Sequence, residues 1–439
     1  MTILTGGIVV ESLDPVRVST APLHVASGRI APEGAAARTH DCSGCLVVPG
    51  NVCAHTHLYS ALARGMPYRL DPPEDFLQIL QRVWWRLDRA LDLDGVGASA
   101  RVGGLEALLS GTTTLIDHHA SPCAVDGSLD VLEGALSGLG VRHVLCYETS
   151  DRDGAAVARA GLQENRRFIV RAAREALPLS RGLVGAHASF TLSDDTLRAL
   201  VEEALDLECG LHVHAAEDGV DAGAVERLAA CGALDARTLL AHGVHLDEHE
   251  LRLVAEAGSW LAHNARSNMN NAVGRAEAAA LDVRVPLGTD GIGADMFEES
   301  HTAWFRLRED GAGGSPDWPL RRLADGARLA GSLFGEPLLG TLVAGAPADL
   351  VVLDYDAPTP VDPATVAGHW VYGLGARHVR DVMVAGEWVV LDRRPVRIDP
   401  HELAHDARRE AARLWHRLDG VEAHPFAPRG ARRWQPTGV

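Results

Sequence analysis

The central part of the chain alternates short apolar runs with stretches whose apolar residues recur at helical spacing. The apolar runs are of strand length, and eight of them end at His55, Asp117, Cys146, His187, His214, His242, His263 and Asp290. Strands that alternate with helices predict βα units and a parallel sheet. Eight units within about 240 residues predict an α/β fold of the (β/α)8 TIM-barrel type, whose functional side chains lie at the carboxyl ends of the strands.

The two ends of the chain have a different pattern. Residues 3–48 are short alternating segments separated by turns, and a similar pattern returns in residues 345–353 and in a predicted hairpin at residues 379–391. These segments predict a small β-sandwich domain assembled from both ends, with residues 1–49 and 345–395 flanking a barrel of residues 50–344.

Two further segments interrupt this scheme. Residues 64–93 carry apolar side chains at helical spacing and predict an inserted helix that covers the site. Its Trp84 and Trp85 are suited either to stack a heterocycle or to pack in the core. Residues 396–439 predict a C-terminal helix and a tail, and the tail from residue 420 is expected to be poorly ordered because it is rich in Pro, Gly and Arg.

Composition narrows the class of protein. With 439 residues and 46% hydrophobic content, the chain can bury a large core, and its net charge of -18 argues against nucleic acid as a partner. No window approaches the roughly 20 apolar residues of a membrane span, and no basic region precedes the first apolar run. Seven scattered cysteines are typical of a reducing compartment. The expected location is the cytoplasm, without a membrane partner.

Lysine is absent, and all 41 basic residues are arginine. The absence excludes a carbamylated lysine that bridges two metals, a Schiff-base lysine for pyridoxal phosphate and the lysine of a phosphate-binding loop.

The strongest local motif is an apolar run, residues 47–54, that ends in His55 and His57. Alternate residues of a strand face the same side, so both imidazoles are predicted to point into the barrel and bind one cation. A His-x-His pair alone is weak evidence in a chain with 21 histidines. The strand that precedes this pair makes the prediction specific.

A second strand of this kind ends at His214, which can supply a third nitrogen. Glu217 follows just beyond the strand and can move a proton between water and substrate, although it could also begin a solvated helix. His212 points the same way as His214 but one layer deeper, so it is expected behind the ligands or in the core.

The last two motifs complete the predicted site. His242 ends a strand and can hydrogen-bond the attacking water or the developing oxyanion, whereas His245 is expected to be a loop residue. Asp290 ends the last predicted strand, where an acid can ligate a metal and accept a proton from water. Three histidines and one aspartate leave a position open for metal-activated water.

Other classes of catalytic site have sequence motifs with characteristic spacing. The chain has no Pro-Cys-x-x-Cys or Gly-x-Ser-x-Gly sequence. Cys42 and Cys45 have redox spacing but no thioredoxin-like context. His118 and His119, at the second strand end, could either contact a substrate or be structural.

Longer motifs give a resemblance to a known family. Residues 54–60, 83–88, 146–154 and 267–271 resemble the amidohydrolase superfamily, in particular its deaminase and chlorohydrolase branch and most closely the aminohydrolases of the SsnA type. The resemblance spans nearly the whole chain. One departure is that Ala265 and Arg266 precede the Ser-Asn pair, where many deaminases carry proline.

The resemblance implies one zinc, with iron as the alternative, on the residues matching His55, His57, His214 and Asp290. It assigns the proton shuttle to Glu217 and the orientation of water to His242, and Asp290 joins them as a catalytic residue. It also implies substrate contacts from the residues matching Arg152 and His187, and a homo-oligomer as the expected assembly.

The predicted function is hydrolytic deamination of a small nitrogen heterocycle such as a purine, a pterin or a related cyclic amidine. The same site could instead open a cyclic amide or remove a halogen. A metal-binding protein without catalysis is the remaining alternative, which the filled catalytic positions argue against.

Overall fold

The computed structural model describes residues 1–32, 38–277, 283–309, 311 and 314–428. Two four-stranded parallel sheets form its centre, in the orders β11-β10-β9-β8 and β12-β13-β14-β15. Their strands are β8(Asn51–Thr56), β9(Thr112–His119), β10(Arg142–Tyr147), β11(Ser180–Gly182), β12(Val184–Ala188), β13(Leu211–Ala215), β14(Leu239–His242) and β15(Trp260–Ala262).

Isolated parallel bridges connect these sheets at both sides. The bridge Thr149–Ala186 joins the first sheet to the second. On the other side, His263 pairs with Leu287 and Thr56 pairs with Asp290, so the segment ending at Asp290 lies between β15 and β8. Seven of the eight predicted runs are thus strands or end directly beside one. The eighth, which ends at Asp290, pairs with its neighbours only through single bridges among the described residues.

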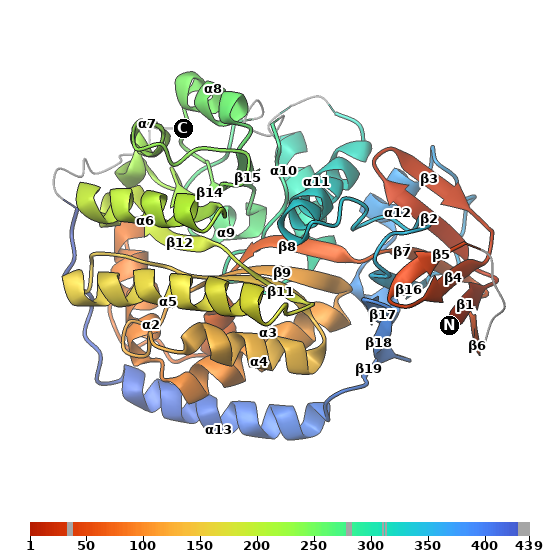
Figure 1. Ribbon diagram of the computed structural model, residues 1–439, viewed down its shortest axis with the longest axis horizontal. Helices are drawn as coiled ribbons and strands as arrows, with labels where there is room; N and C mark the ends of the chain where they lie inside the picture. The colour runs from red at the N-terminus through yellow and green to blue at the C-terminus, as the bar shows by residue number, and fades with distance from the viewer. Residues whose placement is uncertain (33–37, 278–282, 310, 312–313, 429–439) are drawn as a thin grey trace.

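Helices follow most of these strands and lie outside them (Figure 1). Their amphipathic sequences bury one face against the strands, and side-chain caps mark their starts, such as Ser193 and Asp247. They are α3(Leu93–Leu109), α4(Ser128–Leu139), α5(Ala155–Arg174), η3(Ser189–Thr191), α6(Asp194–Asp206), η4(Gly219–Asp221), α7(Ala224–Ala230), α8(Glu248–Ala257), α9(Ala265–Asn270), α10(Met296–Glu309) and α11(Asp317–Phe334).

The predicted insertion is helical, but it is broken into short pieces. They are α1(Phe76–Ile79), a π-helical turn η2(Leu80–Trp84) and α2(Trp85–Ala90), and the short helix η1(Leu58–Ala63) precedes the insertion. Asp75 starts α1 by accepting a hydrogen bond from the Gln78 backbone N–H at 2.8 Å. The π-helical turn shifts the helical register where the two tryptophans begin, and such turns are frequent at functional sites.

Both ends of the chain contribute to a seven-stranded sheet at the right of Figure 1, in the order β19-β18-β17-β16-β7-β2-β3. A four-stranded sheet, β5-β4-β1-β6, accompanies it, and one hydrophobic cluster contains side chains from both. The strands are β1(Thr2–Thr5), β2(Ile8–Leu13), β3(Val16–Ser19), β4(Leu23–Ala26), β5(Arg29–Ala31), β6(Arg38–Asp41), β7(Cys45–Pro49), β16(Leu350–Asp354), β17(Val379–Val384), β18(Glu387–Leu391) and β19(Arg394–Pro395). The short helices α12(Val366–Tyr372) and η6(Ala376–His378) precede β17.

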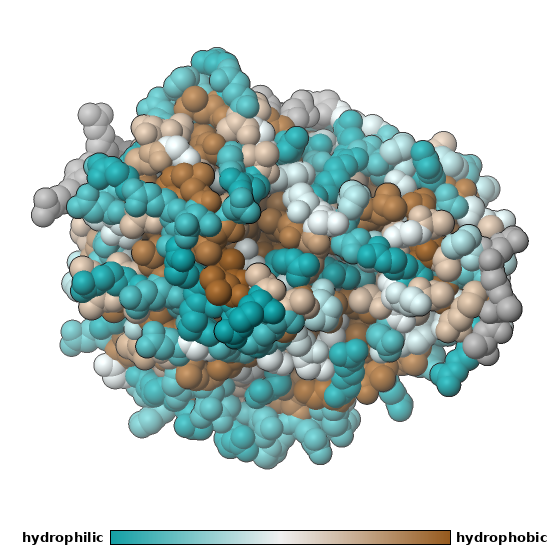
Figure 2. All heavy atoms as spheres, in the orientation of Figure 1, coloured by the Kyte–Doolittle hydropathy of each residue, from teal (hydrophilic) through white to brown (hydrophobic). Residues whose placement is uncertain are grey.

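The predicted C-terminal helix is α13(Pro400–Leu418), which lies along the lower edge of the molecule and turns polar side chains outward (Figure 2). The tail beyond it is anchored as far as residue 428. His424 donates its backbone N–H to the Gln81 carbonyl at 2.9 Å, and the Gln81 side chain donates to the Phe426 carbonyl at 2.7 Å. The expected poor order therefore does not hold for this stretch, and residues 429–439 lie outside the described residues. Within the described part of the chain, no helix has the length and apolar character to cross a bilayer.

A buried ion pair connects β10 to the seven-stranded sheet. The Arg142 guanidinium donates to both Asp349 carboxylate oxygens, at 2.8 and 3.0 Å, and the Ala385 backbone N–H donates to the same carboxylate at 2.7 Å. Both side chains are almost fully buried. Replacement of Asp349 by alanine would leave a buried cation without a partner, which is costly.

We therefore expect Asp349→Ala to lower the free energy of unfolding by about 3 to 5 kcal/mol. Denaturant titration measures the loss, and the exposed pair Arg198 with Asp195 provides the control. Asp195→Ala should change stability by less than about 1 kcal/mol. Equal small losses in the two variants would contradict a structural role for the buried pair.

Candidate functional site

Five predicted residues meet at the carboxyl ends of the parallel strands. His55 comes from β8 and His57 directly follows this strand, His214 comes from β13, His242 from the end of β14, and Asp290 from the segment beside β8. His57 Nε2 lies 2.9 Å from Asp290 Oδ1 and 3.2 Å from His214 Nε2, and His55 Nε2 lies 3.8 Å from Asp290 Oδ1. Ligand atoms of His55, His214, His242 and Asp290 all lie within 4.8 Å of one another.

The protonation pattern of these imidazoles fits a metal. His57 Nδ1 donates to the His118 carbonyl at 2.5 Å, so its Nε2 is free to offer a lone pair. His55 Nε2 is buried without a hydrogen-bond partner, and its Nδ1 lies 2.9 Å from His212 Nε2. Imidazole nitrogens that converge with a carboxylate are the donor set that a divalent transition metal prefers.

Burial and neighbouring charge shift the pKa values of these groups in opposite directions. Burial lowers the pKa of His55 and of His214 well below the ordinary value. Burial also lowers the pKa of His57, but the hydrogen bond and negative charge of Asp290 outweigh it and raise that pKa to about 9. Without a metal, His57 and Asp290 therefore form an ion pair at neutral pH.

Glu217 lies beside this cluster and faces the same cavity. Its Oε1 accepts a hydrogen bond from the Asn271 side chain at 3.2 Å, and its Oε2 lies 3.5 Å from His242 Nε2. Burial and then the charge of Asp290 raise the pKa of Glu217 to about 7, against the opposing effects of His242 and Asn271. A carboxyl group with this pKa can both take and return a proton near neutral pH.

The backbone at two site residues is in a conformation that L side chains rarely adopt. His242 has φ of 79° and Asp290 has φ of 53°. Strained backbone of this kind persists where the surrounding structure holds it, and it clusters at active sites. Here it turns the two side chains toward the cluster as their segments end.

Helix α9 supplies positioning residues that sequence analysis did not assign. Ser267 donates its hydroxyl to Asp290 Oδ2, and Asn268 Oδ1 accepts a hydrogen bond from His242 Nδ1 at 2.9 Å. The recognisable string at residues 267–271 was the available signal, but its spacing alone does not reveal which group each side chain meets.

Removal of the Asn268 side chain should misorient His242. We expect Asn268→Ala to lower kcat about 10- to 100-fold, because groups that orient a catalytic imidazole usually contribute this much. Steady-state kinetics measures the loss, and Asn270→Ala on the exposed side of α9 provides the control. If the two variants lost activity equally, the hydrogen bond to His242 would not matter.

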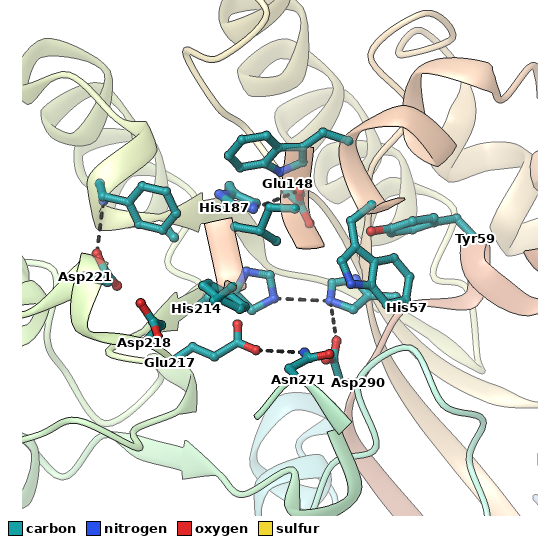
Figure 3. Close-up of a pocket in the computed structure, with 16 residues that line it drawn as sticks. His57, Tyr59, Glu148, His187, His214, Glu217, Asp218, Asp221, Asn271 and Asp290 are labelled. Atoms are coloured by element: carbon teal, nitrogen blue, oxygen red, sulfur yellow. Dashed lines mark hydrogen bonds and ion pairs between the residues drawn. The ribbon is translucent and has the colours of Figure 1, made fainter. Parts of the chain in front are cut away.

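A cavity lies above the cluster (Figure 3). Its walls combine aromatic and acidic side chains, and no arginine is among the described lining residues. The lining residues are His57, Tyr59, Phe76, Leu80, Trp84, Trp85, Glu148, His187, Ala188, Phe190, His214, Glu217, Asp218, Asp221, Asn271 and Asp290. Trp84 and Trp85 line the cavity and also pack in a hydrophobic cluster with Phe76 and Leu80, so they combine the two positions considered for them.

The two predicted substrate residues are placed differently. His187 lines the cavity, and its Nδ1 donates to Thr191 Oγ1 at 2.9 Å. Arg152 lies one layer behind the wall, where its guanidinium pairs with Asp88, with Asp153 at 3.3 Å and with Glu148 at 3.0 Å. Because its nitrogens are already paired, Arg152 is placed to hold the wall in position.

The remaining histidines lie behind the site. His118 Nε2 donates to the His212 carbonyl at 3.1 Å, and His119 pairs with Ser121 at 2.9 Å. His212 contacts His55 from the deeper layer, as its place in the strand suggested. His245 is a loop residue that donates to the Val273 carbonyl at 2.7 Å.

Glu148 was not singled out from the sequence, although it follows β10 directly. Burial raises its pKa, but His187, His118 and Arg152 together lower that pKa well below its usual range. The cavity wall therefore carries an ionised carboxylate.

Known proteins are similar to this chain in sequence. A sequence model of the amidohydrolase family matches residues 46–389. A 5-methylthioadenosine/S-adenosylhomocysteine deaminase of Haloarcula marismortui is 33% identical over 407 residues, which cover 85% of this chain and 88% of the relative.

Solved structures show the same fold. An adenosine deaminase from Xanthomonas campestris with bound zinc has a TM-score of 0.83 at 25% identity, over 94% of this chain and 98% of that chain. An atrazine chlorohydrolase from Arthrobacter aurescens complexed with zinc has a TM-score of 0.77 at 22% identity, over 94% of this chain and 100% of that chain. The second likeness concerns the fold alone.

Proposed function

This chain belongs to the amidohydrolase family, and we propose that it is a zinc-dependent hydrolase that deaminates a nitrogen heterocycle. The observation that carries the proposal is the convergence of three imidazoles and one carboxylate beside Glu217 at the floor of an aromatic cavity. The deaminase named among its relatives supports C–N hydrolysis as the reaction.

The proposed architecture has a (β/α)8 barrel of residues 50–344 and a small β-sandwich of residues 1–49 and 345–395, followed by the helix and tail of residues 396–439. The isolated bridges that link the two parallel sheets support the barrel. The hydrophobic cluster shared by the two outer sheets supports the sandwich. A homo-oligomer stays a prediction from the resemblance.

We assign one zinc to His55, His57, His214 and Asp290. When bound, the ion lowers the pKa of water from about 15.7 to roughly 7 and makes a nucleophile available at neutral pH. His242 Nε2 is buried without a hydrogen-bond partner and orients the attacking water.

Glu217 takes a proton from that water and delivers it to the ring nitrogen next to the reacting carbon. Asp290 then relays the second proton to the departing amine. Water and the amino-heterocycle thus become the oxo-heterocycle and ammonia, with every proton accounted for.

The acidic residues that line the cavity limit which substrates can bind. Its lining includes the acids Glu148, Glu217, Asp218, Asp221 and Asp290, and no arginine is among the described lining residues. A phosphorylated or carboxylated substrate would meet like charge there. The proposed substrate is therefore an uncharged or cationic amino-heterocycle, stacked by Trp84 or Trp85.

The proposal is tested by ammonia release from purines, pterins, triazines and cyclic ureas with the zinc-loaded protein, with Asp290→Asn as the blank. Release from a subset of amino-heterocycles, absent in the blank, is the expected result. Silence across the panel at full zinc content would overturn deamination and redirect the search to ring opening and dehalogenation.

A further inference from the structure

Glu148 lies on the other side of the candidate ligands from Glu217, with His57 and His214 between the two acids (Figure 3). Glu217 serves the proton transfers of the proposed function, but Glu148 has no part in them. Burial of a charged carboxylate in the wall of a cavity costs free energy unless another group binds it, and such carboxylates often belong to functional sites.

The protein holds this carboxylate in place from behind. Arg152 Nη1 donates to Oε1 at 3.0 Å, and Arg152 is itself fixed by Asp88 and Asp153. Oε2 lies 3.3 Å from His118 Nδ1. Paired with a guanidinium, Glu148 is ionised, and an ionised carboxylate accepts hydrogen bonds without donating any.

The neighbouring imidazole of His187 leaves the Glu148 carboxylate available as a hydrogen-bond acceptor. The Thr191 hydroxyl donates to the Ala188 carbonyl at 3.0 Å, so Thr191 accepts the proton of His187 Nδ1. His187 Nε2 lies 3.6 Å from Glu148 Oε1, too far for a hydrogen bond that would occupy this oxygen. This part of the wall offers acceptors.

The wall lies next to the reaction centre. Ligand atoms of His57, His118, Glu148 and His214 all lie within 4.8 Å of one another. A planar ring whose reacting carbon sits over His57 and His214 thus brings its next ring positions within reach of Glu148, since hydrogen bonds span about 2.7 to 3.2 Å. Glu148 meets the ring itself, close to the bond that breaks.

A donor completes the wall. Trp85 lines the same cavity and is 1% exposed, and its Nε1–H has no hydrogen-bond partner among the described residues. Its ring stacks on the Arg152 guanidinium, whose Cζ lies 5.3 Å from the ring centroid, so it neighbours the group that holds Glu148. A buried N–H without a hydrogen-bond acceptor costs free energy, and a substrate carbonyl that accepts its hydrogen bond would remove this cost.

We infer that Glu148 and Trp85 recognise the adjacent N–H and C=O of an oxo-heterocycle. This inference rests on the proposed function and names its substrate class: an amino-heterocycle that carries a lactam or cyclic urea. An adenine ring presents an unprotonated nitrogen at the corresponding edge, so two acceptors would face each other. The substrate class thus differs from the adenosine derivatives named for the relatives.

The test measures kcat/KM of the zinc-loaded protein for guanine, adenine and adenosine, in wild type and in Glu148→Gln. Wild type should favour guanine over adenine by at least about 100-fold, because a buried acceptor rejects a ring that lacks the donor. Glu148→Gln should lower kcat/KM for guanine about 10- to 100-fold and should not lower it for adenine, since the amide can donate to a ring nitrogen.

Two results would overturn the inference. One is an equal loss on guanine and adenine, which would make Glu148 merely structural. The other is turnover of adenosine that depends on Glu148 while turnover of adenine does not, which would make a ribose hydroxyl the donor. Asp218→Asn makes the same chemical change at another lining position and should leave the guanine-to-adenine ratio unchanged.

Calorimetric titration with xanthine separates this inference from deamination, because binding needs no turnover. Xanthine should bind about 10- to 100-fold more weakly to Glu148→Gln. Trp85→Phe keeps the ring but loses the N–H, and it should weaken xanthine binding about 3- to 10-fold. Undiminished xanthine binding in both variants would refute the inference even if ammonia is released. Weakened binding without ammonia from any heterocycle would keep the inference and refute deamination.

Discussion

The Glu217→Gln variant should lose about 10²- to 10⁴-fold in kcat and still bind one zinc per chain. The amide keeps the size of the side chain and can still pair with Asn271, but it cannot take a proton from water. Because Glu217 has no place among the assigned ligands, the loss should appear in turnover and not in metal content. Ammonia release and zinc analysis of the same sample measure the two quantities.

Glu226→Gln makes the same chemical change on α7, where the side chain is 55% exposed. Its kcat should stay close to that of wild type. Full activity in Glu217→Gln would remove this residue from the proton transfers. Loss of zinc from that variant would instead make Glu217 a ligand and revise the assigned set.

Removal of the metal should abolish activity and lower stability. The ion binds the folded chain through the lone pairs of several buried side chains, so the chain without metal should melt at a lower temperature. At a free zinc concentration about 1,000 times Kd, binding contributes about 4 kcal/mol to the free energy of unfolding. Chelation followed by one equivalent of zinc should restore both activity and melting temperature.

Zinc binding should also release a proton. Asp290 raises the pKa of His57 to about 9, so at pH 7 the metal-free chain must lose that proton before Nε2 can bind zinc. Zinc affinity should therefore rise with pH up to about 9. The stability that the His57–Asp290 ion pair gives to the metal-free chain has the opposite pH dependence. This contribution to the free energy of unfolding is complete below the ordinary histidine pKa of about 6.5 and is lost as pH rises through about 9.

Calorimetry in two buffers of different ionisation enthalpy counts the released proton. At pH 7 the His57 proton should contribute about one released proton per zinc, and ionisation of the zinc-bound water adds to it because its pKa falls to roughly 7. His245→Gln, which changes a histidine outside the cluster, should leave this count unchanged. A count of zero in wild type would contradict ligation by His57.

The strands of the two parallel sheets were predictable because the apolar runs are short and most of them end in a polar residue. Such a run must pair with neighbours to satisfy its backbone, and parallel pairing brings the polar ends to one edge. That is why His55, His57, His214, His242 and Asp290 could be named together before any contact was known.

Side-chain partners were not predictable in the same way. Arg152 follows the third strand end and was expected at the substrate, but three acids, one of them on the distant insertion, draw its guanidinium behind the wall. Glu148, four residues earlier, lines the cavity instead. Which of two neighbouring charged side chains faces a cavity depends on residues far away along the chain.

The sequence by itself determined the order of the strands and helices, the ends at which chemistry collects and the absence of a lysine-bridged pair of metals. These follow from local periodicity and from residue type. Only the tertiary structure decided that α9 orients His242 and Asp290, that residues 421–428 pack against the insertion, and that Glu148 and Trp85 share one wall. These depend on contacts between distant segments, whose hydrogen bonds and packing leave no periodic trace along the chain.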